Sequence, residues 1–508
     1  MSKHRILLTR IFILGSALLL ICHPSAARSK EPDLILINGD VRTLDAKMPR
    51  AEAVAVSGGK IVAVGRNDEI RKLAGELTRI IDAKGRLVLP GFNDSHVHFA
   101  AIGNKFSSLD VRGLTSAEAV AAKAAEYARF LPKGRWILGS GFANEFAQTE
   151  GKRLFELIAP ITDSNPVLLY SADGKWAFAN ALALEHLNDG RSSRTENGSG
   201  ERSIDGIISG LAMRQIASAV PSDHLRNWPE ILETASNYAA SFGVTSVQDM
   251  HSDELADVYR QLDREGKLKT RVYDCSPMSA LPKLANLGVK AATGDAMVRT
   301  GCVKYFSEGD EAELPELRRD IAAADKAGLQ VMIHAIGPRA NRIVLDAFEW
   351  AAKKNGRRDR RFRVEHAQNA NSEDVPRFAR GAIIPSMQPW LFSRSGPAIF
   401  GRHLQLHSPL AFGSDAPMVE INPLLGIAAA VNGPDGISVE DAVRAYTAGS
   451  AYAEFQEKVK GKIKSGQMAD MVILSEDIFE VDPARIAGTR IVATILNGSV
   501  VYLHQAER

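Results

Sequence analysis

The stretch Gly91-Phe92-Asn93-Asp94-Ser95-His96-Val97-His98-Phe99 is the most informative part of this sequence. It follows the apolar run Leu87-Val88-Leu89-Pro90, which is typical of a β-strand. Side chains alternate between the two faces of a strand, so His96 and His98 are predicted to point the same way. Two neighbouring imidazoles at a strand end suit half of a metal site, since neutral histidine is the commonest nitrogen ligand for zinc. A pair of hydrogen-bonded core or surface histidines is the alternative interpretation.

Eight segments of the central chain have the composition of short strands, and most are followed by a helical pattern. The eight are Leu87–Phe99, Gly243–Asp249, Thr270–Cys275, Cys302–Ser307, Leu329–Ile336, Arg361–Ala367, Ala382–Gln388 and Leu410–Asp415. Pro315–Lys326 and Arg339–Lys354 carry apolar residues at helical spacing and end at Gly328 and Gly356. This alternation predicts an α/β fold, a (β/α)8 TIM barrel over residues 90–454. Residues from about 100 to 228 do not fit the alternation and are predicted to form an insertion after strand one.

Both ends of the chain have a sequence pattern typical of short strands joined by tight turns. Asn38-Gly39 and Gly58-Gly59 separate apolar runs near the start, and Asn497-Gly498 does so near the end. Neither end has enough strands for a stable sheet packing alone. We therefore predict that residues 33–89 and 455–503 form one small β-sandwich together. Asn197-Gly198-Ser199 and Asn497-Gly498-Ser499 also match the glycosylation pattern, but plain Asn-Gly turns are the interpretation we favour.

Residues 1–27 have the pattern of a secretory signal peptide. Three basic residues precede the apolar run Ile11–Cys22, and Ser25-Ala26-Ala27 offers small residues for cleavage. The run is short for a membrane span. Ile21 directly before Cys22 is too large for a lipoprotein cleavage site. We expect an exported protein, periplasmic or secreted, without a stable membrane anchor.

The net charge and the cysteines limit the binding partners and the disulfides that can be expected. The full chain of 508 residues has a formal net charge of +2, and loss of the three basic residues in 1–27 would leave −1. Such a balance lacks the basic footprint that nucleic acid requires, so we expect no nucleic-acid partner. The partner we expect is a small-molecule substrate. Cys275 and Cys302 would remain after cleavage, as buried free thiols or, less in keeping with their place in predicted strands, as a disulfide. The oligomeric state is not predicted.

Ionisable residues recur where the predicted barrel strands end. Those residues are His96 and His98 on strand one, Lys304 on strand four, His334 on strand five, His366 on strand six and Asp415 on strand eight. The C-terminal ends of barrel strands are where such folds carry their chemistry. Each residue alone could be structural, but their coincidence at one face predicts a metal site.

Several ordered motifs resemble one family. They are Pro90–His98, Val303-Lys304, Ile333-His334-Ala335-Ile336-Gly337, Glu365-His366-Ala367-Gln368, Met387-Gln388-Pro389, Phe412-Gly413-Ser414-Asp415-Ala416-Pro417 and Gly466-Gln467-Met468-Ala469-Asp470. From about Asp33 to Tyr502 the chain resembles the metal-dependent amidohydrolase superfamily, in its amidohydrolase family 3 branch. The resemblance implies a barrel with a β-sandwich built from both termini.

The resemblance also implies roles for the clustered residues. His96, His98, Lys304, His334, His366 and Asp415 would be the metal positions, with one or two zinc ions as cofactor. Zinc lowers the pKa of a bound water toward about 7 and polarises a carbonyl. Asp415 would be the catalytic acid–base group. Lys304 would be carboxylated by CO2 and bridge two ions, or would simply pair with a carboxylate.

The chain departs from the family pattern around the substrate. Pro338 stands where an acidic residue is usual, Lys175 where a histidine is usual, and the segment after Ser307 lacks a longer loop. Lys175, Gln388 and Trp390 are candidates for substrate contacts. The metal positions are retained while the surroundings of the substrate are changed.

The sequence is compatible with three functions. The first is an exported metal-dependent hydrolase that cleaves a non-peptide or small-peptide C–N bond with metal-activated water. The second is a hydrolytic deaminase acting on a ring C=N carbon. The third is a catalytically weak metal- or solute-binding barrel, which the altered substrate residues favour. A retained general base such as Asp415 argues against the third.

Overall fold

The computed structural model describes residues 31–106, 108–143, 145–172, 174–187, 205–221, 227–250, 255–393 and 399–507. The predicted signal peptide and Asn197-Gly198-Ser199 lie outside these residues. Within the described part of the chain, no helix has the length and apolar character needed to cross a membrane.

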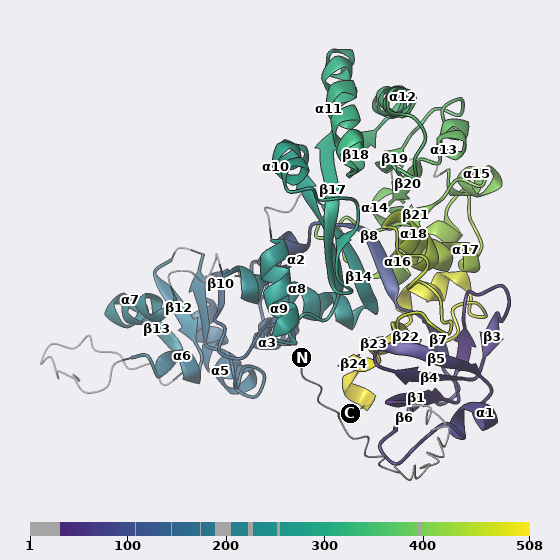
Figure 1. The fold of residues 1–508 in the computed structure, drawn as a ribbon. Helices are drawn as coiled ribbons and strands as arrows, with labels where there is room; N and C mark the ends of the chain where they lie inside the picture. Colours follow the sequence, from purple (N-terminus) through teal and green to yellow (C-terminus); the bar gives the residue numbers. More distant parts are fainter. Residues whose placement is uncertain are drawn as a thin grey trace, which may run out of the picture.

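A parallel sheet of eight strands forms the centre of the molecule (Figure 1). In sheet order the strands are β21 (Ala411–Phe412), β20 (Ile384–Met387), β19 (Arg363–Gln368), β18 (Gln330–Ile336), β17 (Val298–Phe306), β15 (Arg271–Pro277), β14 (Val244–Asp249) and β8 (Phe92–Val97). Most of their residues are buried, as expected of parallel strands covered on both faces. A short strand, β16 (Thr293–Gly294), pairs antiparallel with β17 at its beginning.

The first and last barrel strands meet beside the candidate site. Val97 forms a parallel bridge with Ala416. The His98 N–H donates to the Ala416 carbonyl at 2.9 Å, and the Asp415 N–H donates to the His96 carbonyl at 2.7 Å. The barrel closes through the backbone of the residues predicted to bind metal, so the (β/α)8 prediction is confirmed.

The outer layer consists of helices that follow the strands. They are α8 (Trp228–Ser241), α9 (Ala256–Arg264), α10 (Leu281–Asn286), α11 (Leu314–Ala327), α12 (Pro338–Asn355), α13 (Val375–Gly381), α14 (Pro389–Phe392), α15 (Phe400–Gln405), α16 (Pro423–Asn432), α17 (Val439–Arg444) and α18 (Ser450–Ala453). Helix α11 ends at Gly328, whose φ of 87° is left-handed. A glycine adopts that conformation without the steric cost of a Cβ, which explains the end of the predicted helix there.

The predicted first barrel strand, Leu87–Phe99, is wrong as a single strand. Leu87–Pro90 is β7 of a different sheet, and the barrel strand begins only at Phe92. The chain crosses between the sheets at Gly91, whose N–H donates to the Asp470 carbonyl at 2.9 Å. A Cβ at Gly91 would lie 2.3 Å from the Thr245 side chain, so only glycine fits this crossing.

Two further strands differ from their predicted limits. The fourth begins at Val298 rather than Cys302, because β16 and β17 form an antiparallel pair ahead of the buried segment. The eighth is limited to Ala411–Phe412, and the chain after it bends, with a φ of 63° at Asp415. Cys275 and Cys302 are buried free thiols, as favoured from the sequence.

Both termini contribute to a β-sandwich below the barrel (Figure 1). One sheet has the order β5 (Lys60–Gly65), β4 (Ala53–Ser57), β1 (Leu34–Ile37), β6 (Arg79–Asp82). The other has the order β24 (Ser499–Leu503), β23 (Ile491–Leu496), β22 (Met471–Leu474), β7 (Leu87–Pro90), β2 (Asp40–Arg42), β3 (Arg50–Ala51). Antiparallel pairing of β7 with β22 joins the two ends of the chain in one sheet. Helix α1 (Asn67–Arg71) covers the first sheet through Ile70.

The segment between β8 and β14 carries a sheet of its own, at the left of Figure 1. Its strands are β9 (Leu109–Asp110), β10 (Ile137–Phe142), β11 (Val167–Ser171), β12 (Trp176–Ala179) and β13 (Ile207–Ser209). Its helices are α2 (Phe99–Lys105), α3 (Ala117–Ala128), α4 (Phe146–Thr149), α5 (Gly151–Ile158), α6 (Ala181–Leu184) and α7 (Gly210–Ala219). The predicted insertion is thus a folded unit rather than a long loop.

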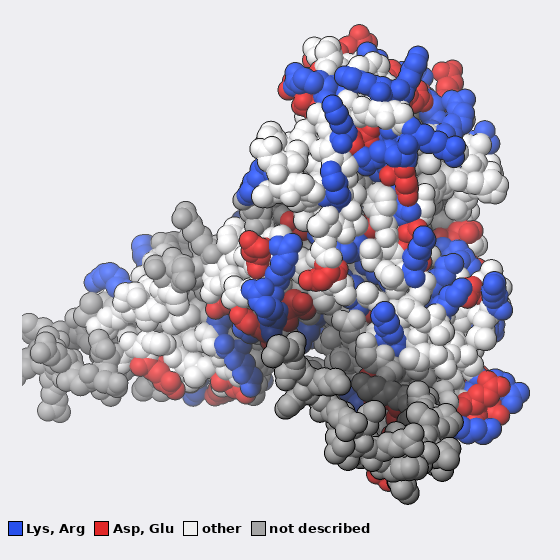
Figure 2. Space-filling model, in the orientation of Figure 1, with Lys and Arg blue, Asp and Glu red and all other residues white. Residues whose placement is uncertain are grey.

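Basic side chains gather over the end of the molecule that carries α11 to α13 (Figure 2). Several of them pair with acidic neighbours there. Arg358 and Arg360 contact the buried carboxylate of Asp325 at 3.2 and 3.0 Å. Arg377 contacts Asp346 at 2.6 Å and Glu349 at 2.8 Å. Much of this basic cluster is therefore engaged in ion pairs with the protein itself.

Candidate metal centre

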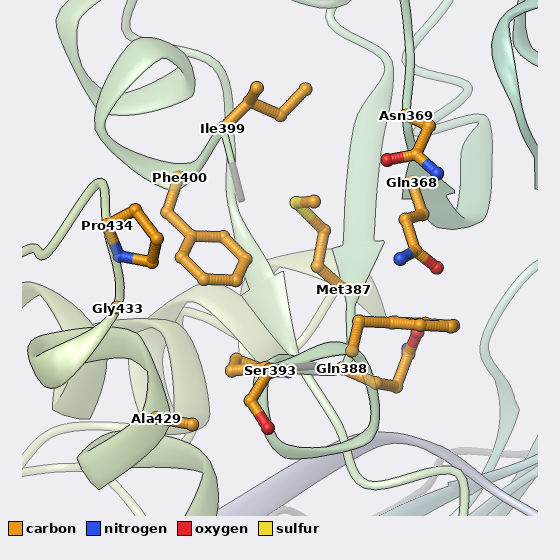
Figure 3. Close-up of a pocket in the computed structure, with 12 residues that line it drawn as sticks. Gln368, Asn369, Met387, Gln388, Ser393, Ile399, Phe400, Ala429, Gly433 and Pro434 are labelled. Atoms are coloured by element: carbon orange, nitrogen blue, oxygen red, sulfur yellow. The ribbon is translucent and has the colours of Figure 1, made fainter. Parts of the chain in front are cut away.

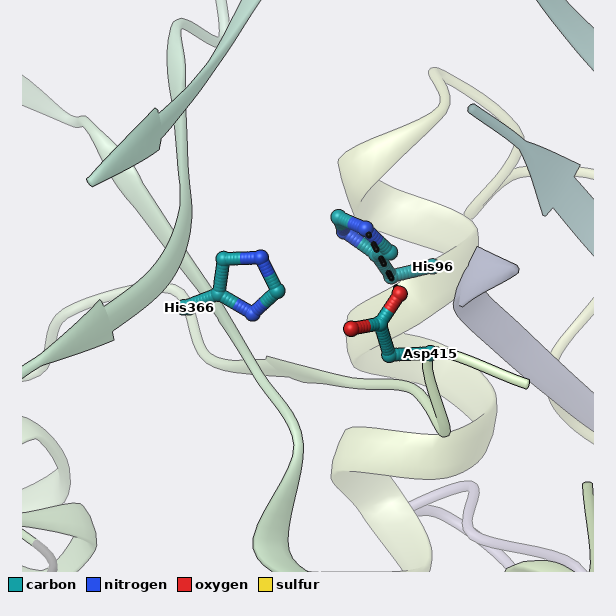
Figure 4. Close-up of side chains that lie close together, drawn as sticks. All are labelled: His96, His366 and Asp415. Atoms are coloured by element: carbon teal, nitrogen blue, oxygen red, sulfur yellow. Dashed lines mark ion pairs between the residues drawn. The ribbon is translucent and has the colours of Figure 1, made fainter. Parts of the chain in front are cut away.

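Three side chains from distant parts of the chain converge at the C-terminal ends of the barrel strands. His96 ends β8, His366 lies on β19, and Asp415 follows β21. One ligand atom from each lies within 4.8 Å of the others, and all three residues are buried (Figure 4). The spacing and chemistry of these nitrogen and oxygen atoms suit a metal ion.

The other predicted ligands surround this group. His98 Nε2 lies 3.3 Å from Asp415 Oδ1, and His96 Nε2 lies 3.4 Å from the same oxygen. His96 and His98 therefore reach one atom, as alternation along a strand predicts. The His334 ring centroid lies 4.4 Å from that of His366. Lys304 on β17 is buried, and its Nζ lies 4.6 Å from the centre of the Phe306 ring.

The hydrogen bonds of His96 fix which of its nitrogens carries the proton. Nδ1 lies 2.6 Å from Glu365 Oε2, an acceptor, and so Nδ1 is the donor. Glu365 in turn accepts from Arg363 Nε at 2.7 Å and Nη2 at 3.0 Å. His96 Nε2 is then left with a lone pair that faces Asp415 Oδ1.

Gln388 fixes the protonated nitrogen of His366, as Glu365 does for His96. Gln388 Nε2 donates to the Ser386 carbonyl at 3.0 Å, which turns Gln388 Oε1 toward His366 Nδ1 at 2.7 Å. His366 Nδ1 is therefore the donor, and its Nε2 is free to accept. Outer hydrogen bonds of this kind orient metal-binding histidines in many proteins.

The resulting site has acceptors facing one another without a proton between them. Among the described residues, the buried atoms His96 Nε2 and Asp415 Oδ1 have no hydrogen-bond partner, and neither does Lys304 Nζ. Two facing acceptors are unfavourable unless a cation lies between them. Histidine nitrogen and carboxylate oxygen are both zinc ligands, so the donor set fits this metal.

Burial keeps the imidazoles neutral. It lowers the pKa of His96 well below its usual range, and Lys304 adds to the shift. Burial likewise lowers the pKa of His366 to about 4, with a contribution from His334. Burial also lowers the pKa of His334, and Lys304 again contributes. These side chains are therefore neutral at pH 7, which is the form that binds metal.

Asp415, unlike these histidines, is held in its charged form. Its burial would raise the pKa of the carboxyl, but the neighbouring His98, His96 and His366 outweigh this and lower the pKa to about 2. The carboxylate is therefore charged at pH 7. A charged oxygen beside the neutral imidazoles of His96 and His366 can hold a cation and can accept a proton.

Asp94 is a participant that sequence reasoning did not single out. Its Oδ1 accepts from the N–H groups of His96 and Ser414, each at 3.0 Å, and so ties β8 to the segment that carries Asp415. Burial raises the pKa of Asp94 to about 7. A possible signal was present, because Asp94 has the same parity along the strand as His96.

Glu365 was missed for a different reason. Adjacent residues on a regular strand face opposite ways, so Glu365 and His366 are not expected to reach the same site. The φ of His366 is 72° and that of Ala367 is 48°, so the backbone leaves the regular strand there. This local change brings both neighbouring side chains into the site.

Of the three residues predicted to contact substrate, Gln388 and Trp390 belong to the barrel, and Lys175 belongs to the inserted sheet. Gln388 is buried and contacts His366, as described above. Trp390 lies on α14 and is 36% exposed. Lys175 lies in the turn that joins β11 to β12, in the inserted sheet rather than on a barrel strand.

A closed parallel barrel whose strand ends bring histidines and an aspartate together defines the class of metal-dependent barrel hydrolases. The chain belongs to the amidohydrolase family, because its residues 79–502 match the model described as "Amidohydrolase family". The resemblance seen in the sequence motifs is confirmed.

The chain is also similar to individual proteins over most of its length. The chain is 31% identical to "Protein LONG AFTER FAR-RED 3" of Arabidopsis thaliana, over 92% of this chain and 91% of that protein. It is 27% identical to "N-substituted formamide deformylase" of Arthrobacter pascens, over 92% of this chain and 98% of that protein. A solved structure of an uncharacterised metal-dependent hydrolase from Pyrococcus furiosus shares 26% identity with a TM-score of 0.60, covering 88% of this chain and all of that one.

Proposed function

We propose that this chain is an exported zinc-dependent hydrolase that cleaves a non-peptide or small-peptide C–N bond of the amide type. The observation that carries the proposal is the pair of buried acceptor atoms, His96 Nε2 and Asp415 Oδ1, 3.4 Å apart. A carboxylate in this position can serve as a metal ligand and also as a general base, and a binding-only protein would gain nothing from the general base.

The residues would divide the reaction between them. His96, His98, His334, His366 and Asp415 would hold zinc, which when bound supplies activation of water and polarisation of a carbonyl. Asp415 accepts the proton of the attacking water as the new C–O bond forms. It then delivers that proton to the leaving nitrogen as the C–N bond breaks, which is general acid–base catalysis.

One relative supports the choice of amides. The Arthrobacter pascens protein is named as a deformylase of N-substituted formamides. Formamides therefore belong at the start of a substrate screen, beside N-acyl amino acids and dipeptides.

The test combines elemental analysis of the purified full chain with that screen. We expect bound zinc, and amide hydrolysis that is lost with chelator and restored by zinc. Release of ammonia from ring amidines, without amide hydrolysis, would instead identify the deaminase. Stoichiometric zinc with neither activity would identify the binding barrel and overturn the proposal.

Lys304 carries a second part of the proposal, namely that its side chain would be carboxylated and would then help to hold a second zinc ion. Its Nζ is buried and finds no hydrogen-bond acceptor within the described residues. A cationic ammonium beside a metal would be repelled by several kcal/mol at an effective dielectric of about 20. Attack of the neutral amine on CO2 forms an N–C bond and releases a proton, which replaces the positive charge with a negative one.

Reconstitution tests the role of Lys304. Apo-protein prepared without CO2 should regain full activity only when bicarbonate is added with zinc, and should then hold two ions per chain. Full recovery with one zinc and no response to bicarbonate would assign Lys304 to an ordinary supporting role.

Export is tested separately. We expect the mature protein in a periplasmic or secreted fraction, with an N-terminus at residue 28. A cytoplasmic protein with residues 1–27 still attached would contradict it.

A further inference from the structure

The turn that carries Asp415 follows the shortest of the eight barrel strands. Strand β21 has only two residues, Ala411–Phe412, and Gly413 and Ser414 lead from it to Asp415. The φ of Asp415 is 63°, a left-handed conformation that is less favourable than the usual ones for a residue with a Cβ. Such a conformation persists where the surrounding contacts impose it. The position of the Asp415 carboxylate therefore depends on what holds this turn.

The barrel strands hold the N–H groups of the turn. The Gly413 N–H donates to the Met387 carbonyl of β20 at 3.0 Å. The N–H groups of Ser414 and Asp415 are bound by β8, as described above. A Cβ at Gly413 would lie 2.5 Å from the His96 backbone nitrogen, so the turn packs directly against β8. The Gly413 carbonyl, in contrast, accepts from outside the barrel strands.

The donor to the Gly413 carbonyl is Tyr446, a buried residue of a π-helical turn. Its Oη donates to that carbonyl at 3.1 Å. The π-helix (Ala445–Gly449) lies between α17 and α18, and such turns are frequent at functional sites. Ser450, just after it, lies 3.2 Å from the Phe412 carbonyl but only 2.7 Å from a carbonyl of its own helical segment. Tyr446 is therefore the main contact from this segment to the end of β21.

Two further contacts fix the Tyr446 side chain. A Cβ at Gly426 of α16 would collide with Tyr446 Oη, so the hydroxyl rests against the backbone of that helix. The Tyr446 ring also meets the Phe412 ring edge-on, with 5.6 Å between the ring centroids. Figure 3 shows Ala429 of the same helix and Met387 of β20 lining one pocket. Helix α16 thus supports both the tyrosine and the strand next to the turn.

We propose that Tyr446 is a positioning residue of the reaction, which fixes the Asp415 carboxylate by holding the Gly413 carbonyl. This inference rests on the proposed hydrolase function and adds to it a residue that touches neither substrate nor metal. Gly413 lies two residues before Asp415, and peptide units are planar, so a rotation of its carbonyl turns the backbone that leads to the carboxylate. A displacement of about 1 Å at a reacting group can cost about 10²-fold in rate.

A purely structural role for the hydroxyl is the alternative. Its loss would leave the buried Gly413 carbonyl without its donor, which lowers stability wherever such a carbonyl lies. A fall in stability is therefore expected under either interpretation. The rate of the chemical step and the arrangement of ligands around a bound metal distinguish the two.

The experiment compares Tyr446→Phe with the wild type as the full chain, loaded with zinc for kinetics and with Co²⁺ for spectroscopy. The substitution keeps the ring and removes only the hydroxyl. We expect kcat to fall about tenfold or more and KM to change less than about threefold, because alignment rather than binding is lost. The visible absorption of bound Co²⁺ should shift, since it reports the arrangement of the ligands, of which Asp415 is one in the proposal.

Tyr127 offers a matched control in the inserted unit. Its hydroxyl also donates to backbone carbonyls, to Lys105 at 2.9 Å and to Ser108 at 3.2 Å. Tyr127→Phe should lower stability and keep the wild-type kcat and Co²⁺ spectrum.

Gly426→Ala tests the same contact from the other side. It leaves Tyr446 in place but displaces its hydroxyl, so it should reproduce the changes seen in Tyr446→Phe. It also stands in for that variant if Tyr446→Phe does not fold.

The outcomes separate the positioning role from the hydrolase function. An unchanged kcat or an unchanged Co²⁺ spectrum in well-folded Tyr446→Phe would overturn the positioning role, and so would equal losses of kcat in Tyr446→Phe and Tyr127→Phe. Absence of turnover with every amide would count against the hydrolase function. The Co²⁺ spectra would still decide the role of Tyr446 in that case, because they need no reaction. A wild type that binds no Co²⁺ would overturn both.

Discussion

Glu454 and Asp415 are buried carboxylates near opposite ends of the same barrel, and their surroundings differ in one respect. Glu454 is fully paired: it accepts from Asn93 at 2.6 Å, pairs with Lys460 at 2.7 Å, and contacts Arg299. Asp415 Oδ1 faces the histidines and has no hydrogen-bond partner in the described chain. The protein's own cationic side chains neutralise Glu454, whereas Asp415 presents an acceptor atom that suits a metal ion.

The pKa shifts follow the same division. Burial opposes ionisation of Glu454, but Arg299 and Lys460 lower its pKa. Burial lowers the pKa of Lys460 to about 8, which Glu454 partly opposes. This group lies near the beginnings of β8 and β17, where barrel residues serve stability, whereas Asp415 lies where they serve chemistry. A buried charge without a partner is therefore the better indicator of function here.

Removal of the proposed metal ligands should have the largest effect. If His96 and His98 bind zinc as proposed, the double variant His96→Ala, His98→Ala should lose bound zinc and all turnover, because two nitrogen donors disappear. Its free energy of unfolding should fall less than that of a core truncation, since β8 stays buried. Mass spectrometry of the metal content is the measurement, and His186→Ala with His504→Ala is the control. Full zinc occupancy in the double variant would show that His96 and His98 do not bind the metal, and would contradict the contrast drawn between Asp415 and Glu454.

Damage to the paired group should instead act on stability. Glu454→Gln leaves Arg299 and Lys460 buried without their carboxylate, which typically costs about 3–5 kcal/mol. Urea unfolding measures this loss, while the zinc content of the folded fraction should not change. Glu440→Gln breaks only the exposed pair with Arg444, so a loss below about 1 kcal/mol is expected. Zinc loss from folded Glu454→Gln protein would show that the paired group around Glu454 also supports metal binding at the opposite end of the barrel.

Replacement of Asp415 should act on the rate. Asp415→Asn keeps the shape but removes the proton acceptor, so kcat should fall about 10²-fold or more while KM changes modestly. Steady-state kinetics on a substrate from the screen is the measurement. Asp441→Asn, at a half-buried position in the first turn of α17, is the control. Near wild-type kcat in Asp415→Asn would assign this residue to structure.

The sequence predicted the barrel well because its signals are local. Apolar runs, helical spacing and a glycine such as Gly328 need no knowledge of distant residues. The split of Leu87–Phe99 was missed, because both halves are buried strand segments and the partner strands differ, β22 for one and β14 for the other. Periodicity within one segment cannot report which sheet that segment joins.

The site was predictable in its positions but not in its supporting contacts. His96, His366 and Asp415 were predicted near the C-terminal ends of strands, and a barrel brings such residues together. The hydrogen bonds from Glu365 and Gln388 depend on the left-handed backbone at His366 and on packing between strands. Neither can be deduced from spacing, because regular alternation would turn Glu365 away.

The smallest effect is expected for Gln388, which supports the proposed ligand His366 through a hydrogen bond. Gln388→Met fills a similar volume but cannot accept from His366 Nδ1, so the imidazole loses its fixed orientation. Zinc affinity should fall about 10- to 100-fold, the usual range for such supporting residues. Competition with a chelator measures this directly, without reference to turnover. Gln388→Glu retains an acceptor and should recover much of the affinity.

Gln330 offers a matched control at the other end of the barrel. It too is a buried glutamine on a barrel strand, with its Nε2 donating to the carbonyls of Arg361 and Ala453 at 2.8 Å each. Gln330→Met should lower stability, because those carbonyls lose their donor, and should leave zinc affinity unchanged. If both glutamine variants lost zinc equally, the orientation of His366 would not be the cause. If Gln388→Met alone lost it, the contrast between a paired end and a cation-binding end would extend to the uncharged residues around each.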